Sequence, residues 1–184
     1  MEKFIPVVVI KDIGEVDTIL PALKRNNINC AEITFRTSCA YDAIVKAVKD
    51  YPDMLIGAGT VINGKQCKSA IKAGAKFIVS PGFSEQTAKI CKRKKIPYYP
   101  GCVTPTEIIK ALEYGITTVK FFPANVYGGL KALKALSAPF PQVKFIPTGG
   151  VDRSNIDEFL AFDKVEAIGG SFFVKEALEL YNKQ

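Results

Sequence analysis

The chain has 184 residues, of which 48% are hydrophobic and 23% are charged, and its formal net charge is +7. This length and composition are typical of a globular protein with a substantial core, so we expect residues 1–184 to form a single domain. No apolar run reaches the ~18–20 residues that span a bilayer, and the amino terminus shows no signal-peptide pattern, so we expect a cytoplasmic protein with no membrane partner.

Short β-rich apolar runs alternate along the chain with longer stretches of helical periodicity. The expected strands span residues 6–10, 30–35, 54–58, 76–80, 97–100, 118–122, 143–147 and 165–168. The expected helices span residues 15–26, 41–50, 65–73, 84–94, 104–114, 129–136, 154–162 and 174–181. Gly74 is a stop signal, Ser84 is a cap, and Thr104 or Pro105 begins the fifth helix.

These elements make eight strand–helix units, which predict a parallel sheet and fit a single α/β (β/α)8 TIM barrel with short terminal segments. An open, doubly wound sheet is the alternative fold. That fold usually has a glycine-rich phosphate turn after its first strand, where this chain has Lys11-Asp12-Ile13-Gly14. The sequence therefore favours the barrel.

Lys120 lies inside the expected sixth strand, between Val119 and Phe121. Lysine is rarely buried without a partner or a purpose. Because burial disfavours an ammonium ion, a lysine in such a position can act as a free amine that attacks a carbonyl. The alternative is an edge-strand lysine whose stem packs on apolar neighbours while its ammonium group reaches water.

Glu32, Thr34 and Arg36 occupy alternate positions in and just after the second strand, which places them on one face if the strand stays regular. A carboxylate there suits general acid–base catalysis, and a guanidinium suits bidentate binding of a substrate carboxylate. An ion pair of Glu32 with Arg36 or Lys120 that only neutralises charge is an equally open interpretation.

Glycine pairs follow the seventh and eighth strands, in Thr148-Gly149-Gly150 and Gly169-Gly170-Ser171. TIM-barrel enzymes frequently bind phosphate with the loops after these two strands and a helix amino terminus. Glycines expose backbone N–H groups, and Ser171 adds a hydroxyl donor. Turn glycines at helix starts are the simpler alternative, but two pairs at these strand ends favour a phosphate site.

The residue types limit the chemistry further. The chain has no histidine, which excludes Ser–His and Cys–His catalysis and argues against a zinc site. Its five cysteines include no Cys-x-x-Cys pair, so they indicate reduced thiols. The lysines are spread along the chain, and the densest run, residues 92–95, resembles a helix end. We therefore expect a small anionic substrate and no nucleic-acid partner.

Six motifs occur in order: E-I-T-F-R-T (32–37), G-A-G-T-V (57–61), S-P-G (80–82), K-F-F-P-A (120–124), P-T-G-G-V (147–151) and G-G-S (169–171). This set covers nearly the whole chain and strongly resembles the KDPG/KHG aldolases, which act on 2-dehydro-3-deoxy-6-phosphogluconate and 4-hydroxy-2-oxoglutarate. The resemblance implies a class I, Schiff-base aldolase on a barrel, with no metal or cofactor, a phosphorylated keto acid as substrate, and a homotrimer.

By the same resemblance, Lys120 matches the lysine that forms the imine, and Glu32 matches the residue that transfers protons, partly through water. Arg36, Thr60 and Thr148 match positions around the keto-acid carboxylate and the substrate chain. The other matches are Pro81 and Phe122 at the pocket wall, with Gly149, Gly150, Gly170 and Ser171 at the phosphate end. The chain departs from the family at its ends, since few residues precede Ile5 and 13 follow Ser171.

Three other functions remain open at this point. The 6-phosphogalactonate aldolases share the motifs and differ in the C4 stereochemistry of their substrate. A non-catalytic phosphosugar-binding barrel would require a substituted lysine or glutamate, yet Lys120 and Glu32 are both present. A phosphosugar epimerase or isomerase barrel would use acid–base pairs without an imine-forming lysine.

Overall fold

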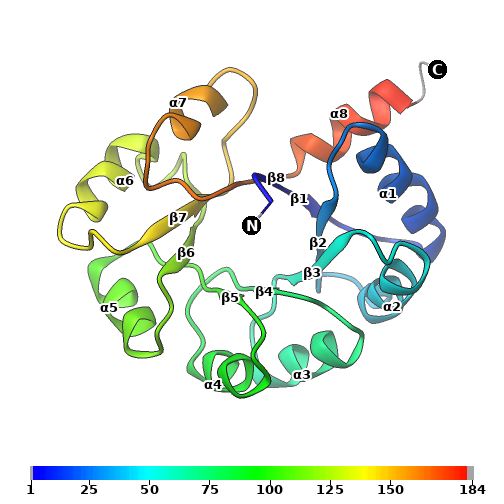
Figure 1. Cartoon of the computed structure of the whole chain (residues 1–184), viewed down its shortest axis with the longest axis horizontal. Coiled ribbons are helices and arrows are strands. Elements are labelled where there is room, and N and C mark those ends of the chain that lie inside the picture. The colour runs from blue at the N-terminus through cyan, green and yellow to red at the C-terminus, as the bar shows by residue number, and fades with distance from the viewer. Residues whose placement is uncertain (1, 182–184) are drawn as a thin grey trace.

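A computed structural model describes residues 2–181 of the chain. Eight β-strands alternate with eight α-helices, and one short 3-10 helix follows the first strand. Figure 1 shows the strands around the centre of the molecule and the helices outside them. Within residues 2–181, no helix is both long and apolar enough to cross a bilayer.

The strands and helices follow the expected order. The strands are β1 (Phe4–Val8), β2 (Cys30–Thr34), β3 (Leu55–Gly59), β4 (Ile78–Val79), β5 (Tyr98–Tyr99), β6 (Thr118–Phe121), β7 (Lys144–Pro147) and β8 (Ile168–Gly170). The helices are η1 (Ile13–Glu15), α1 (Val16–Arg25), α2 (Ala40–Asp50), α3 (Gly64–Lys72), α4 (Glu85–Lys94), α5 (Pro105–Glu113), α6 (Gly129–Ser137), α7 (Ile156–Leu160) and α8 (Phe172–Tyr181).

The strands form a parallel sheet that curls into a partial barrel. Six of them are hydrogen-bonded in the order β5-β4-β3-β2-β1-β8, and β6 pairs with β7 in a second sheet. Isolated bridges connect the two sheets at both sides, from Gly101 to Lys120 and from Thr148 to Gly169. The predicted α/β architecture with parallel strands is thereby confirmed. The chain also lacks the glycine-rich phosphate turn that an open, doubly wound sheet usually has after its first strand.

The residues that were predicted to begin or end helices do so in the structure. Gly74 follows α3 with a φ of +100°, a conformation that disfavours side chains. The Ser84 side chain accepts a hydrogen bond from the backbone N–H of Thr87 at the start of α4. Thr104 and Glu107 form a capping box around Pro105, so α5 begins at the predicted place.

Two boundaries were wrong in ways that matter for the site. β8 was expected at residues 165–168, but Val165 makes only an isolated bridge, and the strand is Ile168–Gly170. Gly169 and Gly170 therefore belong to the strand, where a Cβ on Gly169 would overlap the Thr148 hydroxyl. Similarly, β1 begins at Phe4 rather than at residue 6, because Phe4 pairs with Ile168.

Helix α7 is also shorter than the predicted span of 154–162. The Asp152 carboxylate accepts hydrogen bonds from the Ser154 backbone N–H and hydroxyl, and the Asn155 side chain accepts one from the Asp152 N–H. These side chains satisfy the backbone in a turn conformation, so the helix starts only at Ile156.

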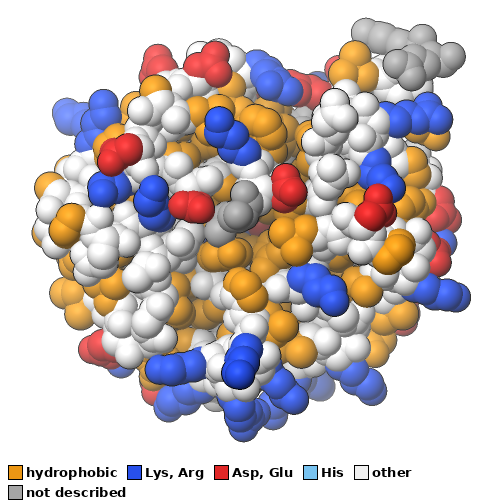
Figure 2. Space-filling view, viewed as in Figure 1, with side chains coloured by type: hydrophobic (Ala, Val, Ile, Leu, Met, Phe, Trp, Pro, Cys, Tyr) orange, Lys and Arg blue, Asp and Glu red, His pale blue; other side chains and the backbone are white. Residues whose placement is uncertain are grey.

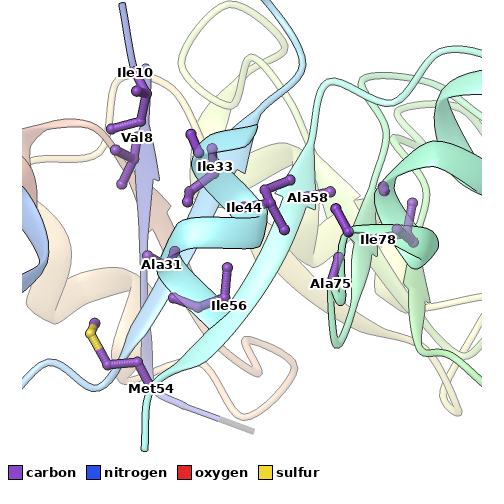
Figure 3. Packing of buried hydrophobic residues seen from close by; sticks show 14 of the residues in the cluster. Val8, Ile10, Ala31, Ile33, Ile44, Met54, Ile56, Ala58, Ala75 and Ile78 are labelled. Carbon is purple, nitrogen blue, oxygen red and sulfur yellow. The ribbon is translucent and has the colours of Figure 1, made fainter. Parts of the chain in front are cut away.

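Successive side chains of each strand point to opposite faces, so the strands separate an outer core from an inner one. Ala31 and Ile33 of β2 point outward into a cluster with the surrounding helices, and Figure 3 shows Ile44 of α2 beside Ile33. Cys30, on the opposite face of β2, belongs to an inner cluster drawn from several strands: Ile5, Cys30, Phe77, Val79, Ile146 and Ala167. This inner cluster fills the space between the strands, so the centre is a packed core.

A glycine at position 101 is required by the close approach of the β4 and β5 loops. A Cβ on Gly101 would overlap the Pro81 carbonyl, which is backbone and cannot rotate away, whereas a Cβ on Gly82 meets nothing within 4 Å. We expect Gly101→Ala to lower the free energy of unfolding by about 1–3 kcal/mol through overpacking. Gly82→Ala is the control and should change it by less than about 1 kcal/mol. Urea unfolding measures both, and equal midpoints would contradict the prediction.

Candidate active site

The centre of the candidate site is a buried ion pair between Lys120 of β6 and Glu32 of β2. The Lys120 Nζ lies 3.4 Å from Glu32 Oε1, although the two residues are 88 positions apart in the sequence. Lys120 is 5% exposed and Glu32 is 2% exposed. Lys120 is thus not an edge-strand lysine with its head in water, because its ammonium group meets a carboxylate inside the sheet.

Neighbouring strands hold both partners in place. The backbone N–H of Lys120 donates to the Pro100 carbonyl at 2.8 Å, which ties β6 to the end of β5. Glu32 pairs in register with Val7 of β1 and Gly57 of β3. A Cβ on Gly59 would overlap the Glu32 carboxylate, so the glycine of the G-A-G motif leaves the space that this side chain occupies.

Arg36 and Thr60 form a second polar group beside this pair. The Arg36 Nε donates to Thr60 Oγ1 at 2.9 Å, and Arg36 makes no ion pair within the described residues. Thr60 has a φ of +54°, a left-handed conformation that is strained for a β-branched residue. Strained residues cluster at functional sites, where the surrounding structure maintains them. Here the conformation places the hydroxyl against the guanidinium.

The two glycine segments meet at the other side of the site. Gly149 and Gly150 have φ values of +85° and +75°, and the Gly149 carbonyl accepts a hydrogen bond from the Asn125 N–H in the loop after β6. Thr148 bridges to Gly169, and Ser171 directly precedes α8. The predicted phosphate end therefore combines loop backbone, one hydroxyl and the start of a ten-residue helix.

Eight of the eleven predicted site residues line one cavity of about 190 Å³. They are Arg36, Lys120, Phe122, Thr148, Gly149, Gly150, Gly170 and Ser171. Glu32 contacts Lys120, and Thr60 contacts Arg36. Pro81 is exposed and does not line this cavity; its carbonyl lies against Gly101 instead. With two cations in its wall and one carboxylate on Lys120, the cavity suits an anionic ligand.

Sequence reasoning missed the apolar part of the wall. Val7, Val9, Val151 and Phe172 also line the cavity. The alternation of Val7 and Val9 along the first strand was a usable signal, since Ile5 and Val7 share the inward face. Phe172 carried no signal, because only the fold brings the start of α8 to this place. Phe122 was predicted to line the pocket wall, and the centre of its ring lies 5.2 Å from Lys120 Nζ.

Two other groups define the surroundings of Lys120. Thr34 is the last residue of β2, so Arg36 lies in the turn that follows the strand and not on its face. The Thr34 hydroxyl is buried without a hydrogen-bond partner in the described part of the chain. The backbone of Cys102 donates to the Lys120 carbonyl, but burial raises the pKa of the Cys102 thiol to about 12. This thiol therefore stays protonated and does not compete with Lys120 as a nucleophile. Across residues 2–181, no cluster of three or more His, Cys, Asp or Glu side chains could hold a metal ion.

A family model described as KDPG and KHG aldolase matches residues 1–183, the full extent of the strands and helices above. The chain belongs to this family. A curated relative of this aldolase, the KHG/KDPG aldolase of Escherichia coli K12, is 42% identical over 176 residues, which cover 95% of this chain and 83% of the relative. This aldolase is therefore a carbon–carbon lyase, as the motifs predicted.

Solved structures agree with this assignment. The KDPG aldolase of Legionella pneumophila, with pyruvate captured as a covalent carbinolamine intermediate, matches at a TM-score of 0.92 and 40% identity, covering 98% of this chain and 88% of that one. The aldolase of Zymomonas mobilis ZM4, solved with 3-phosphoglycerate, matches at a TM-score of 0.91 and 36% identity, covering 97% and 88%.

The buried pair predicts a measurable effect on the stability of this aldolase. Lys120→Met leaves the Glu32 carboxylate buried without its cation. We expect a loss of about 2–3 kcal/mol in the free energy of unfolding, less than the ~3–5 kcal/mol of fully enclosed pairs because Lys120 borders the cavity.

Adding Glu32→Gln to Lys120→Met removes the stranded charge and should recover about 1 kcal/mol or more, since contacting residues are not additive. Urea unfolding followed by circular dichroism gives the loss in free energy of unfolding for Lys120→Met, for Glu32→Gln and for the double variant. Losses that simply add in the double variant would show that the two side chains do not stabilise each other.

Proposed function

We propose that this aldolase cleaves a 2-keto-4-hydroxy acid through an imine on Lys120. The observation that carries the proposal is the contact of Lys120 with Glu32 at a cavity that also contains Arg36 and the glycine segments. An amine within reach of a carboxylate can lose its proton locally and attack a carbonyl. The carbinolamine of pyruvate in the Legionella pneumophila relative supports the same chemistry here.

The proposed reaction gives each of these groups a role. The Lys120 amine attacks the C2 carbonyl, and loss of water from the carbinolamine gives a protonated imine. Glu32, through a water molecule, takes the proton of the C4 hydroxyl, and the C3–C4 bond breaks with its electrons flowing to the imine nitrogen. An aldehyde leaves. Protonation of the enamine at C3 and hydrolysis then release pyruvate and restore Lys120.

We assign the two anionic ends of the substrate to different residues of the cavity. We place the keto-acid carboxylate at Arg36, whose Nε is held by Thr60. Thr148 and the Phe122 ring flank the carbon chain, and the distal phosphate lies at the Gly149–Gly150 and Gly170–Ser171 segments. The aldehyde product is then glyceraldehyde 3-phosphate from 2-dehydro-3-deoxy-6-phosphogluconate, or glyoxylate from 4-hydroxy-2-oxoglutarate.

The same proposal includes a closed (β/α)8 barrel, a single domain over residues 1–184 and a cytoplasmic location. The isolated bridges on both sides of the β6–β7 pair support closure. We also propose a homotrimer, which rests on the family resemblance. Multi-angle light scattering measures the mass in solution, and a monomeric mass would contradict the trimer.

Borohydride trapping tests the imine directly. After incubation with pyruvate and sodium borohydride, we expect peptide mass spectrometry to find a reduced pyruvyl adduct on Lys120. Lys144→Ala is the matched control, because Lys144 begins the neighbouring strand and is half-buried but lies outside the cavity. Its adduct at Lys120 should be unchanged.

Lys120→Ala should abolish both the adduct and the aldol cleavage. A folded wild-type protein without an adduct would exclude the class I mechanism. Cleavage activity that survives in Lys120→Ala would favour an epimerase-like or other acid–base function for this cavity.

Ser171 gives a test of the phosphate end. Ser171→Ala removes one hydroxyl donor to a charged group, a contact worth about 1.5–3 kcal/mol. We expect the KM for 2-dehydro-3-deoxy-6-phosphogluconate to rise about 10-fold or more, with kcat within about twofold. Steady-state kinetics with 4-hydroxy-2-oxoglutarate, which lacks the phosphate, serve as the control. An equal rise in KM for both substrates would contradict this placement of the phosphate.

A further inference from the structure

The net positive charge of the chain lies in one segment, residues 64–97, which contains α3 and α4. This segment has nine Lys or Arg residues and one Glu, a net charge of +8, whereas the rest of the chain has 16 basic and 17 acidic residues. The segment thus holds nine of the 25 basic residues of the chain but only one of its 18 acidic residues. Figure 2 shows the result as a gathering of Lys and Arg side chains along the lower edge, where Figure 1 places α3 and α4.

Cations in this segment also differ from the others in their partners. Elsewhere many are paired with carboxylates, as in Lys24–Asp53, Lys46–Asp50 and Arg153–Glu176. Among the described residues, the segment contains one ion pair, Lys89–Glu85. Its other eight basic residues have no carboxylate of residues 2–181 within 4.0 Å. An uncompensated patch of one sign attracts ligands of the opposite sign.

Four of these cations converge on one groove between the two helices. Each helix contributes an isoleucine and two basic residues at positions i, i+3 or i+4, which share one helix face. The groove has a volume of about 440 Å³, within the ~300–1,000 Å³ typical of small-molecule sites. It is lined by Lys68, Ile71 and Lys72 of α3 and by Ile90, Arg93 and Lys94 of α4.

The packing of the two helices holds these rows opposite each other. Cys67 of α3 and Cys91 of α4 are buried, and their Sγ atoms lie 3.6 Å apart beneath the groove. Each cysteine adjoins a groove residue in sequence, Lys68 and Ile90 respectively. The distance between the two rows is thus set by close contact in the core rather than by flexible surface side chains.

Helix dipoles account for only part of this charge. Cations in the last turn of a helix are stabilised by a partial charge of about −0.5, so two helices offset about one unit charge. The last turns of α3 and α4 already contain four basic residues: Lys72, Lys92, Arg93 and Lys94. Lys68 lies a full turn before the end of α3, yet it lines the same groove.

We propose that the α3–α4 groove binds a small polyphosphate, such as a nucleoside triphosphate. Its phosphates contact Lys68, Lys72, Arg93 and Lys94, and the rest of the ligand packs on Ile71 and Ile90. A nucleic acid fits less well, because no aromatic residue lines the groove for base stacking. The site is separate from the aldolase cavity, since the two share no lining residue.

Isothermal titration calorimetry with inorganic triphosphate and with ATP, in magnesium-free buffer at physiological ionic strength, tests the proposal. We expect one site per chain for each probe, with ATP binding more tightly because of the isoleucines. Lys72→Gln/Arg93→Gln should weaken binding of both probes at least 10-fold. Both residues are exposed, so the variant should fold, and thermal unfolding checks this.

The matched control is Lys49→Gln/Lys131→Gln, which removes the same charge from exposed positions outside the groove. It should change the affinity less than about twofold. Equal weakening in both double variants would mean attraction by net charge alone and would overturn the proposal. So would binding that persists in Lys72→Gln/Arg93→Gln, no binding at millimolar probe, or binding of a single-stranded oligonucleotide but of neither small probe.

Discussion

The contact between Glu32 and Lys120 is the constraint on which the rest of the structure depends. These charges lie on strands β2 and β6, which belong to different hydrogen-bonded sheets, and they meet only because the strands curl around a common interior. A buried charge without its partner is strongly destabilising. Gly59 of the adjoining strand gives the carboxylate its space. The interior below the pair is closed by apolar residues from several strands, so the pair faces the cavity.

Chemistry and recognition are divided within this cavity. In the proposed mechanism the ion pair supplies a nucleophile and a carboxylate, while Arg36 and the glycine segments of the same cavity receive the two anionic groups of the substrate. Thr60 holds a strained backbone conformation beside Arg36, and Gly149 and Gly150 adopt left-handed conformations at the other end. Of the three non-glycine residues with a left-handed backbone in the described part of the chain, Thr60 lies at the site, whereas Asn27 and Lys95 follow helices α1 and α4. The strain at Thr60 is therefore maintained by its surroundings at the site.

Outside the strands, the helices differ in their surface charge. On the other helices several cations are paired with carboxylates, such as Lys24, Lys46 and Lys110. Helices α3 and α4 together contain seven basic residues and one acidic residue, with a single ion pair among the described residues. Our two proposals place anions at two positions: the cavity at the strand ends, and an exposed groove between helices. Because the two places share no residues, each can be altered by substitution without touching the other.

The sequence by itself determined the order of the strands and helices, the caps at Ser84 and Thr104, and the candidate lysine and glutamate, because periodicity, capping and charge inside a strand are local properties. It misplaced β8, since pairing of Ile168 with Phe4 is a long-range contact that local β-propensity does not encode. It also did not show that Phe172 enters the cavity or that Pro81 stays outside it. Only the tertiary structure decided those points and showed which residue is the partner of Lys120. Each of them depends on distances between residues far apart in the chain.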